Sequence, residues 1–390
     1  MKRSEAVFVF VMTLLAFGLS ASGQQTTVTS LPPASSVAAT SQPGTVPGLR
    51  FETIASGIHL IWTPRHEAKV VVAEFSTFVA LIEAPFDDRT VRDILAELRA
   101  RFPKKPLRYA LHSHHHDHSI NAVDPLLVAG AQIVTSGYNL DQLLTATADE
   151  ALLRSRVVLV DDRFEIADQT NRLRVWLLKQ GRGENQWLVP TAEYMVFDFP
   201  DQQVLVSGCM YNKPLTYHEV VNQRKPSLLK FIESHGLKVR TIVPTNTSSA
   251  GGFEDVCTMQ MLQDTLEQGI KPEEVSKRFG AMTAIEMRDR LDAIVEEFKT
   301  KTPRSFDLMV CSSQLLRDGF PDHSIVLLDA AIKLFPSDPW PAFESGVRLW
   351  ELGRTPEAEE RWKTALALAK DSNEREDMER TIGEKRVMVK

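Results

Sequence analysis

Half of the histidines in this chain lie in one short stretch. The chain has 390 residues and 10 histidines, and five of them fall within residues 111–119, in the run Leu-His-Ser-His-His-His-Asp-His-Ser. Imidazole nitrogens and carboxylate oxygens are the ligands that zinc and similar divalent ions take in proteins. The apolar segment 107–111 just before this run predicts a strand, so the run should occupy a loop at a strand end. The spacing therefore predicts a metal site, and the other interpretation is a solvated polar turn.

The order of the residues in the run suggests which side chains act together. In an extended chain, side chains two positions apart share a face. If the run stays extended, His112, His114 and His116 point one way, and Ser113 and His115 point the other. Two histidines separated by one residue can then bind one ion.

Composition limits the classes of protein that need to be considered. Hydrophobic residues make up 43% and charged residues 25% of the chain, as in ordinary globular proteins, and the net charge is −6. The sequence has no long basic run, so nucleic acid is not an expected partner. The three cysteines, Cys209, Cys257 and Cys311, are far apart and odd in number, which does not predict a disulfide framework.

The N-terminus is typical of an exported protein. Residues 1–23 combine Lys2 and Arg3 with an apolar run and then small residues, as in a secretory signal peptide. The apolar run is too short for a comfortable transmembrane helix, so we expect no transmembrane span once the signal is removed. The alternative is a retained N-terminal anchor. We expect export to a bacterial periplasm or out of the cell, with residues 24–48, rich in Ser, Thr, Pro, Ala and Gly, as a disordered linker.

Residues 49–258 predict a layered α/β domain. Short β-branched runs typical of strands alternate with segments of helical apolar spacing throughout this region. Strands are expected at 78–84 and 107–111, a hairpin over 194–199 and 204–207, and a single helix over 140–151.

The C-terminal part has a different pattern. Residues 259–302 predict a helical connector. In residues 303–390, Gly319 and Gly353, and Ala331 and Ala365, lie 34 positions apart. A helix-turn-helix period of 34 residues resembles the tetratricopeptide (TPR) repeat, which implies a protein or peptide partner. The alternative is an unrelated helical hairpin.

The run Ser-His-His-His-Asp-His at 113–118 resembles the His-x-His-x-Asp-His signature of the metallo-β-lactamase superfamily, with one residue fewer between the second histidine and the aspartate. This resemblance implies an αββα sandwich with a metal site at the loop ends of two sheets. Three registers are open. Anchoring on Asp117 keeps His115 and places Ser113 in the first histidine position; anchoring on the histidines keeps His114 and His116; an insertion would use His112 and His114.

We favour the register with His114 and His116. Asp117 and His118 would then supply the second metal subsite, and Asp117 would also be the base that orients water. The family's Gly-Asp pair after the hairpin is Gly208-Cys209 here. A thiolate binds zinc well, and a buried apolar cysteine is the other interpretation.

Two further ligand positions of the family depart from its pattern. The third histidine is replaced by the stretch that contains Glu184 and Asn185, where Glu184 is a candidate ligand and a lost ligand is the favoured interpretation. The last histidine is replaced by Asn246. His218 is a candidate substitute, and a surface histidine is the alternative. The resemblance thus implies one rearranged site, with a single zinc ion (Zn²⁺) held by His114, His116 and either His118 or Asp117, helped by Cys209, or else no functional site.

Two functions follow from these residues. The first is an exported zinc-dependent hydrolase with an incomplete metal site, acting on a small molecule that the sequence does not identify. The second is a catalytically inactive protein of the same fold that serves as a binding module, with the TPR-like region contacting a protein or peptide.

Overall fold

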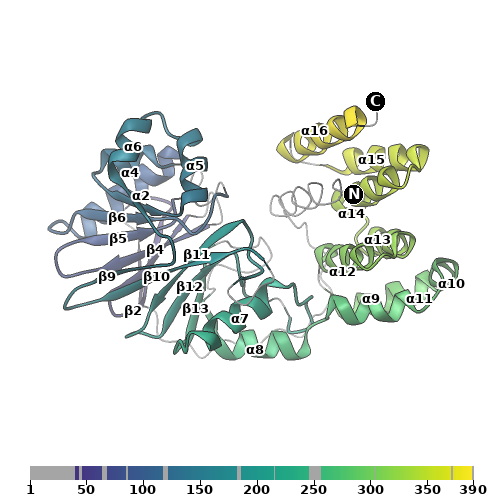
Figure 1. Ribbon diagram of the computed structural model, residues 1–390, viewed down its shortest axis with the longest axis horizontal. Coiled ribbons are helices and arrows are strands. Elements are labelled where there is room, and N and C mark those ends of the chain that lie inside the picture. The colour runs from purple at the N-terminus through teal and green to yellow at the C-terminus, as the bar shows by residue number, and fades with distance from the viewer. Residues whose placement is uncertain are drawn as a thin grey trace. The chain divides into compact units, whose positions relative to one another are not determined.

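Figure 1 shows a computed structural model of the chain, which describes residues 40–43, 46–63, 68–84, 87–116, 122–181, 186–214, 216–245, 256–302, 304–369 and 372–388. The described residues form two compact units. The α/β unit contains the described residues up to Lys213 and those of Gln223–Gln263. The helical unit contains those of Pro214–Asn222 and of Asp264–Lys390.

Eight strands form the first sheet of the α/β unit and follow one another across it in chain order. They are β1 (Thr40–Pro43), β2 (Arg50–Ala55), β3 (Ile58–Thr63), β4 (Ala68–Glu74), β5 (Val79–Ile82), β6 (Leu107–Leu111), β7 (Gln132–Thr135) and β8 (Val157–Leu159). The strands from β5 to β8 are parallel. Parallel neighbours need crossover connections, and helices provide them here: α2 (Asp88–Arg101), α4 (Asp124–Val128), α5 (Gly137–Ala146) and α6 (Glu150–Arg156).

The second sheet has six strands in the order β14-β13-β12-β11-β10-β9. Their bounds are β9 (Arg163–Ala167), β10 (Arg172–Lys179), β11 (Glu193–Phe199), β12 (Val204–Gly208), β13 (Thr241–Pro244) and β14 (Cys257–Thr258). β11 and β12 form the expected hairpin, and only the β12–β13 pair is parallel among the described strand pairs of this sheet. Helix α7 (Arg224–Ser234) is the crossover between them.

The two sheets pack face to face, with helices on the outside (Figure 1). Alternation along β4 shows how the sequence produces these layers. Val71 faces the core between the sheets, whereas Val70 and Val72 face the core under α2, α4, α5 and α6. On the outer face of the second sheet, the rings of Trp176 and Phe231 from α7 lie 6.0 Å apart. This αββα sandwich, followed by an all-helical region, confirms the predicted fold class.

The prediction of one helix over residues 140–151 is wrong, because two helices occupy this region. The Ser136 side chain caps α5 by accepting a hydrogen bond from the Asn139 amide at 3.3 Å. Asp149 then caps α6 by accepting from the Leu152 amide at 2.9 Å. Aspartate is a strong N-cap residue, so it begins a new helix inside an apolar pattern that reads as continuous.

One carboxyl group is buried on the outer face of the second sheet. Asp198, on β11, lies opposite Arg174 on β10 and Leu205 on β12. Its side chain is 2% exposed, and its Oδ2 atom lies 3.7 Å from Arg174 Nη1. Burial raises the pKa of Asp198 to about 6, although Arg174 and Arg163 act in the opposite direction.

The C-terminal helices are α8 (Met259–Gln268), α9 (Pro272–Gly280), α10 (Ala284–Asp289), α11 (Leu291–Lys299), α12 (Ser305–Arg317), α13 (Pro321–Leu334), α14 (Pro339–Glu351), α15 (Thr355–Leu368) and α16 (Ser372–Met388). α12 and α14 begin 34 residues apart, and so do α13 and α15. Gly319 and Gly353 end α12 and α14 with φ of 87° and 74°, a conformation that favours glycine. The all-helical region and its period are therefore present, and assignment to the TPR class stays a prediction.

No helix in the described part of the chain combines the length and the apolar character needed to cross a bilayer.

Candidate metal centre

The histidine run follows a central strand of the first sheet. β6 lies between β5 and β7 and ends at Leu111, after which the His112 amide still donates to the Val134 carbonyl at 3.3 Å. Residues 113–116 then bend instead of continuing the strand. The expectation of an extended run with strict alternation is therefore wrong. The bend brings the Ser113 side chain against the His114 ring, so the two side chains do not lie on opposite faces.

The bend and the end of β12 bring three ligand atoms together. His114 Nε2 lies 2.9 Å from His116 Nδ1 and 3.4 Å from Cys209 Sγ. All three ligand atoms lie within 4.8 Å of one another, and all three residues are buried. The structure thus joins the favoured histidine pair to the predicted cysteine across 95 positions of sequence.

A chain of hydrogen bonds behind His114 fixes the direction of its ring. The Ser113 hydroxyl donates to Glu83 Oε1 at 2.5 Å, and the Ser113 oxygen lies 2.6 Å from His114 Nδ1. Because the hydroxyl proton is given to the carboxylate, Nδ1–H of His114 must be the donor to Ser113. Nε2 then carries the lone pair and faces His116 and Cys209. A carboxylate that orients a ligand histidine from behind is a common feature of metal sites.

Glu83 has an unusual backbone conformation, which its contacts enforce. It follows β5 with a φ of 74°, and its buried carboxylate also accepts from Thr245 Oγ1 at 3.3 Å. A positive φ is unfavourable for a residue with a Cβ atom and persists where the surroundings enforce it.

The Tyr194 hydroxyl binds the backbone on both sides of Gly208, next to Cys209. The Tyr194 hydroxyl donates to the Ser207 carbonyl at 3.0 Å and accepts from the Cys209 amide at 2.5 Å. Gly208 lies between them with a φ of 57°, and a Cβ atom there would meet the Tyr194 hydroxyl at 2.0 Å. Burial raises the pKa of Tyr194 well above its ordinary value, and Cys209 and Glu83 raise it further, so the phenol stays neutral.

The Arg224 side chain adds a positive charge near the Cys209 thiol. Arg224 is the first residue of α7 and is partly buried. Burial lowers the pKa of Arg224, while negative charge on Cys209 or Tyr194 would raise it. Arg224 therefore interacts electrostatically with both Cys209 and Tyr194.

Of the remaining predicted site residues, five lie outside the part of the chain that the structure describes and one lies in the helical unit. Asp117, His118, Glu184, Asn185 and Asn246 lie outside the described residues. His218 belongs to the helical unit, where its Nδ1 atom lies 3.3 Å from the Gln268 carbonyl.

The two other described histidines of the run, His112 and His115, are not part of the cluster. His115 packs its ring 5.3 Å from that of Tyr138, and His112 is buried. Glu83, Tyr194 and Arg224 were not predicted. Of these, Glu83 had a local signal, since it is a carboxylate at the end of an apolar strand.

The three side chains fit one zinc-like ion. Zinc binds imidazole nitrogen at about 2.0 Å and thiolate sulfur at about 2.3 Å, so ligand atoms around a tetrahedral ion lie roughly 3.3–3.6 Å apart. The separations of 2.9 and 3.4 Å at His114 Nε2 are close to these values. Two imidazoles and a thiolate match the donor preference of zinc. Three protein ligands also leave one coordination position open, as in catalytic zinc sites.

Comparisons with known proteins find similarity only in structure. No protein-family model matches the chain, and no curated protein does either. A metallo-beta-lactamase from Pontibacter korlensis is 17% identical, with 56% of this chain and 98% of that chain covered and a TM-score of 0.44. One from Hirschia baltica is 14% identical, with 57% and 99% covered and a TM-score of 0.41.

The metallo-beta-lactamase FIM-1 from Pseudomonas aeruginosa, in its mono-zinc form, is 16% identical, with 59% of this chain and 94% of that chain covered and a TM-score of 0.37. By its own architecture, the chain is an α/β sandwich protein with a candidate metal centre, followed by an all-helical region.

Proposed function

We propose that this chain is a divergent member of the metallo-β-lactamase superfamily that holds one zinc ion and hydrolyses a small-molecule substrate. The observation that carries the proposal is the convergence of His114, His116 and Cys209 at the loop ends of two sheets. These residues come from the two places where the sequence resemblance expects ligands, and chance would not bring them within bonding reach of one ion.

The residues of the chain have separate tasks in this proposal. His114, His116 and Cys209 hold the ion, and Glu83 acts through Ser113 to keep the His114 lone pair directed at it. A bound zinc ion supplies a water molecule of lowered pKa and polarises a carbonyl or ester group. Asp117 is the proposed base that orients the water. Arg224 supplies a positive charge that interacts with Cys209.

Metal analysis tests the first part of this proposal. The purified full chain, supplemented with zinc and then desalted, should retain about one equivalent by plasma mass spectrometry. Cys209→Ala should lose most of it, whereas Cys257→Ala should not, because Cys257 is also buried, in β14, but lies outside the cluster. Absence of zinc in the supplemented wild type, or equal retention in both variants, would sink the proposal.

Hydrolysis is tested separately with β-lactams, thioesters, lactones and phosphodiesters. An active protein should lose turnover when zinc is removed by a chelator and regain it on reloading. Turnover that survives complete removal of the metal would contradict the zinc-dependent mechanism.

A binding module is the second candidate function, and the 34-residue period of the helical unit favours it. Repeats of this kind stack helix pairs and present extended binding surfaces, which suits a protein or peptide partner. If the catalytic site has been lost, restoring histidine with Glu184→His and Asn246→His should create hydrolysis that the wild type lacks. Strong activity in the wild type would exclude this candidate.

We also propose that the protein is exported by a signal peptide over residues 1–23, supported by the charge and apolar pattern there. Mass spectrometry of the protein recovered from the bacterial periplasm or culture medium should show a new N-terminus near residue 24. Recovery of the intact chain in the membrane fraction would instead indicate a retained anchor.

A further inference from the structure

The loop between Cys209 and Arg224 is shared between the two units. Its middle part, Pro214–Asn222, belongs to the helical unit, whereas Cys209 and Arg224 belong to the α/β unit. Cys209 lies five positions before Pro214, and Arg224 lies two positions after Asn222. Contacts that fix this segment therefore restrain a loop that begins and ends at the candidate metal centre.

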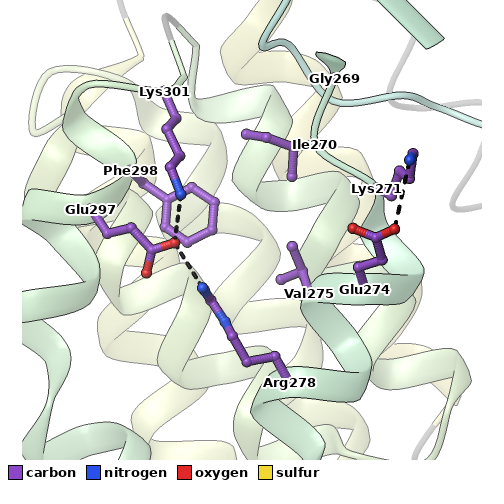
Figure 2. Close-up of a pocket in the computed structure, with 9 residues that line it drawn as sticks. All are labelled: Gly269, Ile270, Lys271, Glu274, Val275, Arg278, Glu297, Phe298 and Lys301. Carbon is purple, nitrogen blue, oxygen red and sulfur yellow. Dashed lines mark hydrogen bonds and ion pairs between the residues drawn. The ribbon is translucent and has the colours of Figure 1, made fainter. Parts of the chain in front are cut away.

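Backbone pairing is the first of these contacts. Val220 lies opposite Ile270 in a parallel bridge; the Val221 amide donates to the Ile270 carbonyl at 2.8 Å, and the Ile270 amide donates to the Glu219 carbonyl at 3.1 Å. Figure 2 shows the Ile270 side chain in a pocket that Val275 and Phe298 also line. These apolar side chains all pack in or against one core cluster of the helical unit, which also contains Val220.

A glycine allows this close approach. A Cβ atom at Gly269 would meet the Thr265 carbonyl oxygen at 2.4 Å, and on the segment side Val221 Cγ2 at 2.5 Å and the Glu219 carbonyl oxygen at 2.7 Å. Real Cβ atoms do not approach backbone oxygen so closely, so a larger residue would push the segment away.

A buried charged network is the third contact. Arg304 Nη2 lies 2.8 Å from Glu219 Oε2 and 3.7 Å from Asp307 Oδ1. The Val220 amide donates to Asp307 Oδ1 at 3.3 Å, and the Thr302 hydroxyl donates to Asp307 Oδ2 at 2.5 Å. The Glu219 and Asp307 side chains are only 3% and 2% exposed, and that of Arg304 is 17% exposed. Removing one member of a buried charged network leaves an uncompensated charge, so this network holds the segment far more strongly than surface ion pairs would.

We propose that Glu219, Arg304 and Asp307 are positioning residues for Cys209, and that the helical unit controls the thiol through the loop that it holds. When the network is intact, the ordered segment leaves only short connections to Cys209 and Arg224. When the network opens, the connection from Tyr211 to Arg224 becomes one long loop with many conformations, and the surroundings of the thiol lose this restraint. The role in metal binding rests on the proposed zinc site, whereas the effect on the thiol does not.

Reactivity of the three cysteines tests the proposal in the metal-free full chain. Alkylation by N-ethylmaleimide in excess chelator is followed for each cysteine by peptide mass spectrometry. Asp307→Ala and Gly269→Ala should each accelerate labelling of Cys209 by about tenfold or more, because contacts to a charged group or a close packing contact are lost. Labelling of Cys257, which is buried in β14 of the α/β unit, should change by less than about twofold in this mechanism.

Arg348→Gln is the matched control. It breaks another buried ion pair of the helical unit, with Glu344 at 3.3 Å, in α14 and away from the loop. It should leave the Cys209 rate unchanged. Equal acceleration of Cys209 and Cys257, or an effect of Arg348→Gln as large as that of Asp307→Ala, would show general unfolding and overturn the proposal. An unchanged Cys209 rate in both loop variants would overturn it as well.

Cobalt titration, read from the thiolate-to-metal absorption band, separates this proposal from the proposed function. If the wild type binds cobalt, Asp307→Ala and Gly269→Ala should weaken binding. If the wild type binds none, the zinc site is wrong, and the cysteine rates still decide whether the helical unit holds the loop.

Discussion

Replacing Asp198 by asparagine should make the protein more stable at neutral and alkaline pH. Asp198 is a carboxyl group with a 2% exposed side chain, and its only described ion pair joins it to Arg174 at 3.7 Å. Burial raises its pKa from an ordinary 3.8 to about 6 in the folded protein. The folded state therefore binds this proton more tightly than the unfolded state does.

The sign and the size of the effect follow from proton linkage. Because the folded-state pKa is the higher one, the free energy of unfolding falls as the pH rises from about 4 to above 6. The pKa difference of roughly two units corresponds to about 3 kcal/mol, at about 1.4 kcal/mol for each unit. The substituted amide carries no charge at any of these pH values, so Asp198→Asn should exceed the wild type by up to about 3 kcal/mol near pH 8 and by little near pH 4.

Urea unfolding across this pH range measures the difference. Asp201→Asn is the matched control, because Asp201 is a nearby carboxylate whose side chain is 59% exposed. It should show no comparable pH-dependent gain. If Asp198→Asn is less stable than the wild type near pH 8, the attraction to Arg174 outweighs burial, and the reasoning is refuted.

Three further substitutions test the site and the helical unit. Gly208→Ala should destabilise the fold by about 3 kcal/mol, because it combines a positive φ with a clash against Tyr194; a loss below about 1 kcal/mol in urea unfolding would contradict this. Ser113→Ala should weaken zinc binding by about 10–100-fold in chelator competition while the unfolding midpoint changes little, and unchanged affinity would remove the orienting role of the hydroxyl. Gly346→Ala should destabilise the helical unit by about 1–3 kcal/mol, although alanine is the better helix former, because its Cβ atom would lie 2.5 Å from Trp362 Cδ1; a gain in thermal stability would show that the ring moves aside.

The sequence predicts the layers of the fold because local patterns determine them. β-branched runs form the strands, alternation assigns residues such as Val70 and Val71 to opposite cores, and the histidine run necessarily follows a central strand. Cys209 is singled out by the resemblance to the metallo-β-lactamase signature and not by a local pattern, and its thiol lies with His114 and His116 in the candidate centre.

The sequence does not predict features that depend on contacts between distant segments. The bend at residues 113–116 depends on the Glu83 carboxylate, 30 positions away, which holds the Ser113 hydroxyl. The need for glycine at position 208 depends on the Tyr194 hydroxyl. No periodicity contains such information, because each contact depends on how two separately formed strands are juxtaposed.

The loop between Cys209 and Arg224 also affects the order in which parts of this protein can form their contacts during synthesis. The hydrogen bond from the Val220 amide to Asp307 spans 87 positions, so its acceptor leaves the ribosome long after its donor. The described strands of the sandwich and both histidines of the candidate centre have been synthesised by then, whereas the segment Pro214–Asn222 gains this contact only after α12 is made. Contacts over such separations slow folding because the loop must close before they contribute. A nascent chain that stops before α12 would therefore contain every described strand of the sandwich and still lack this contact to the segment that follows Cys209.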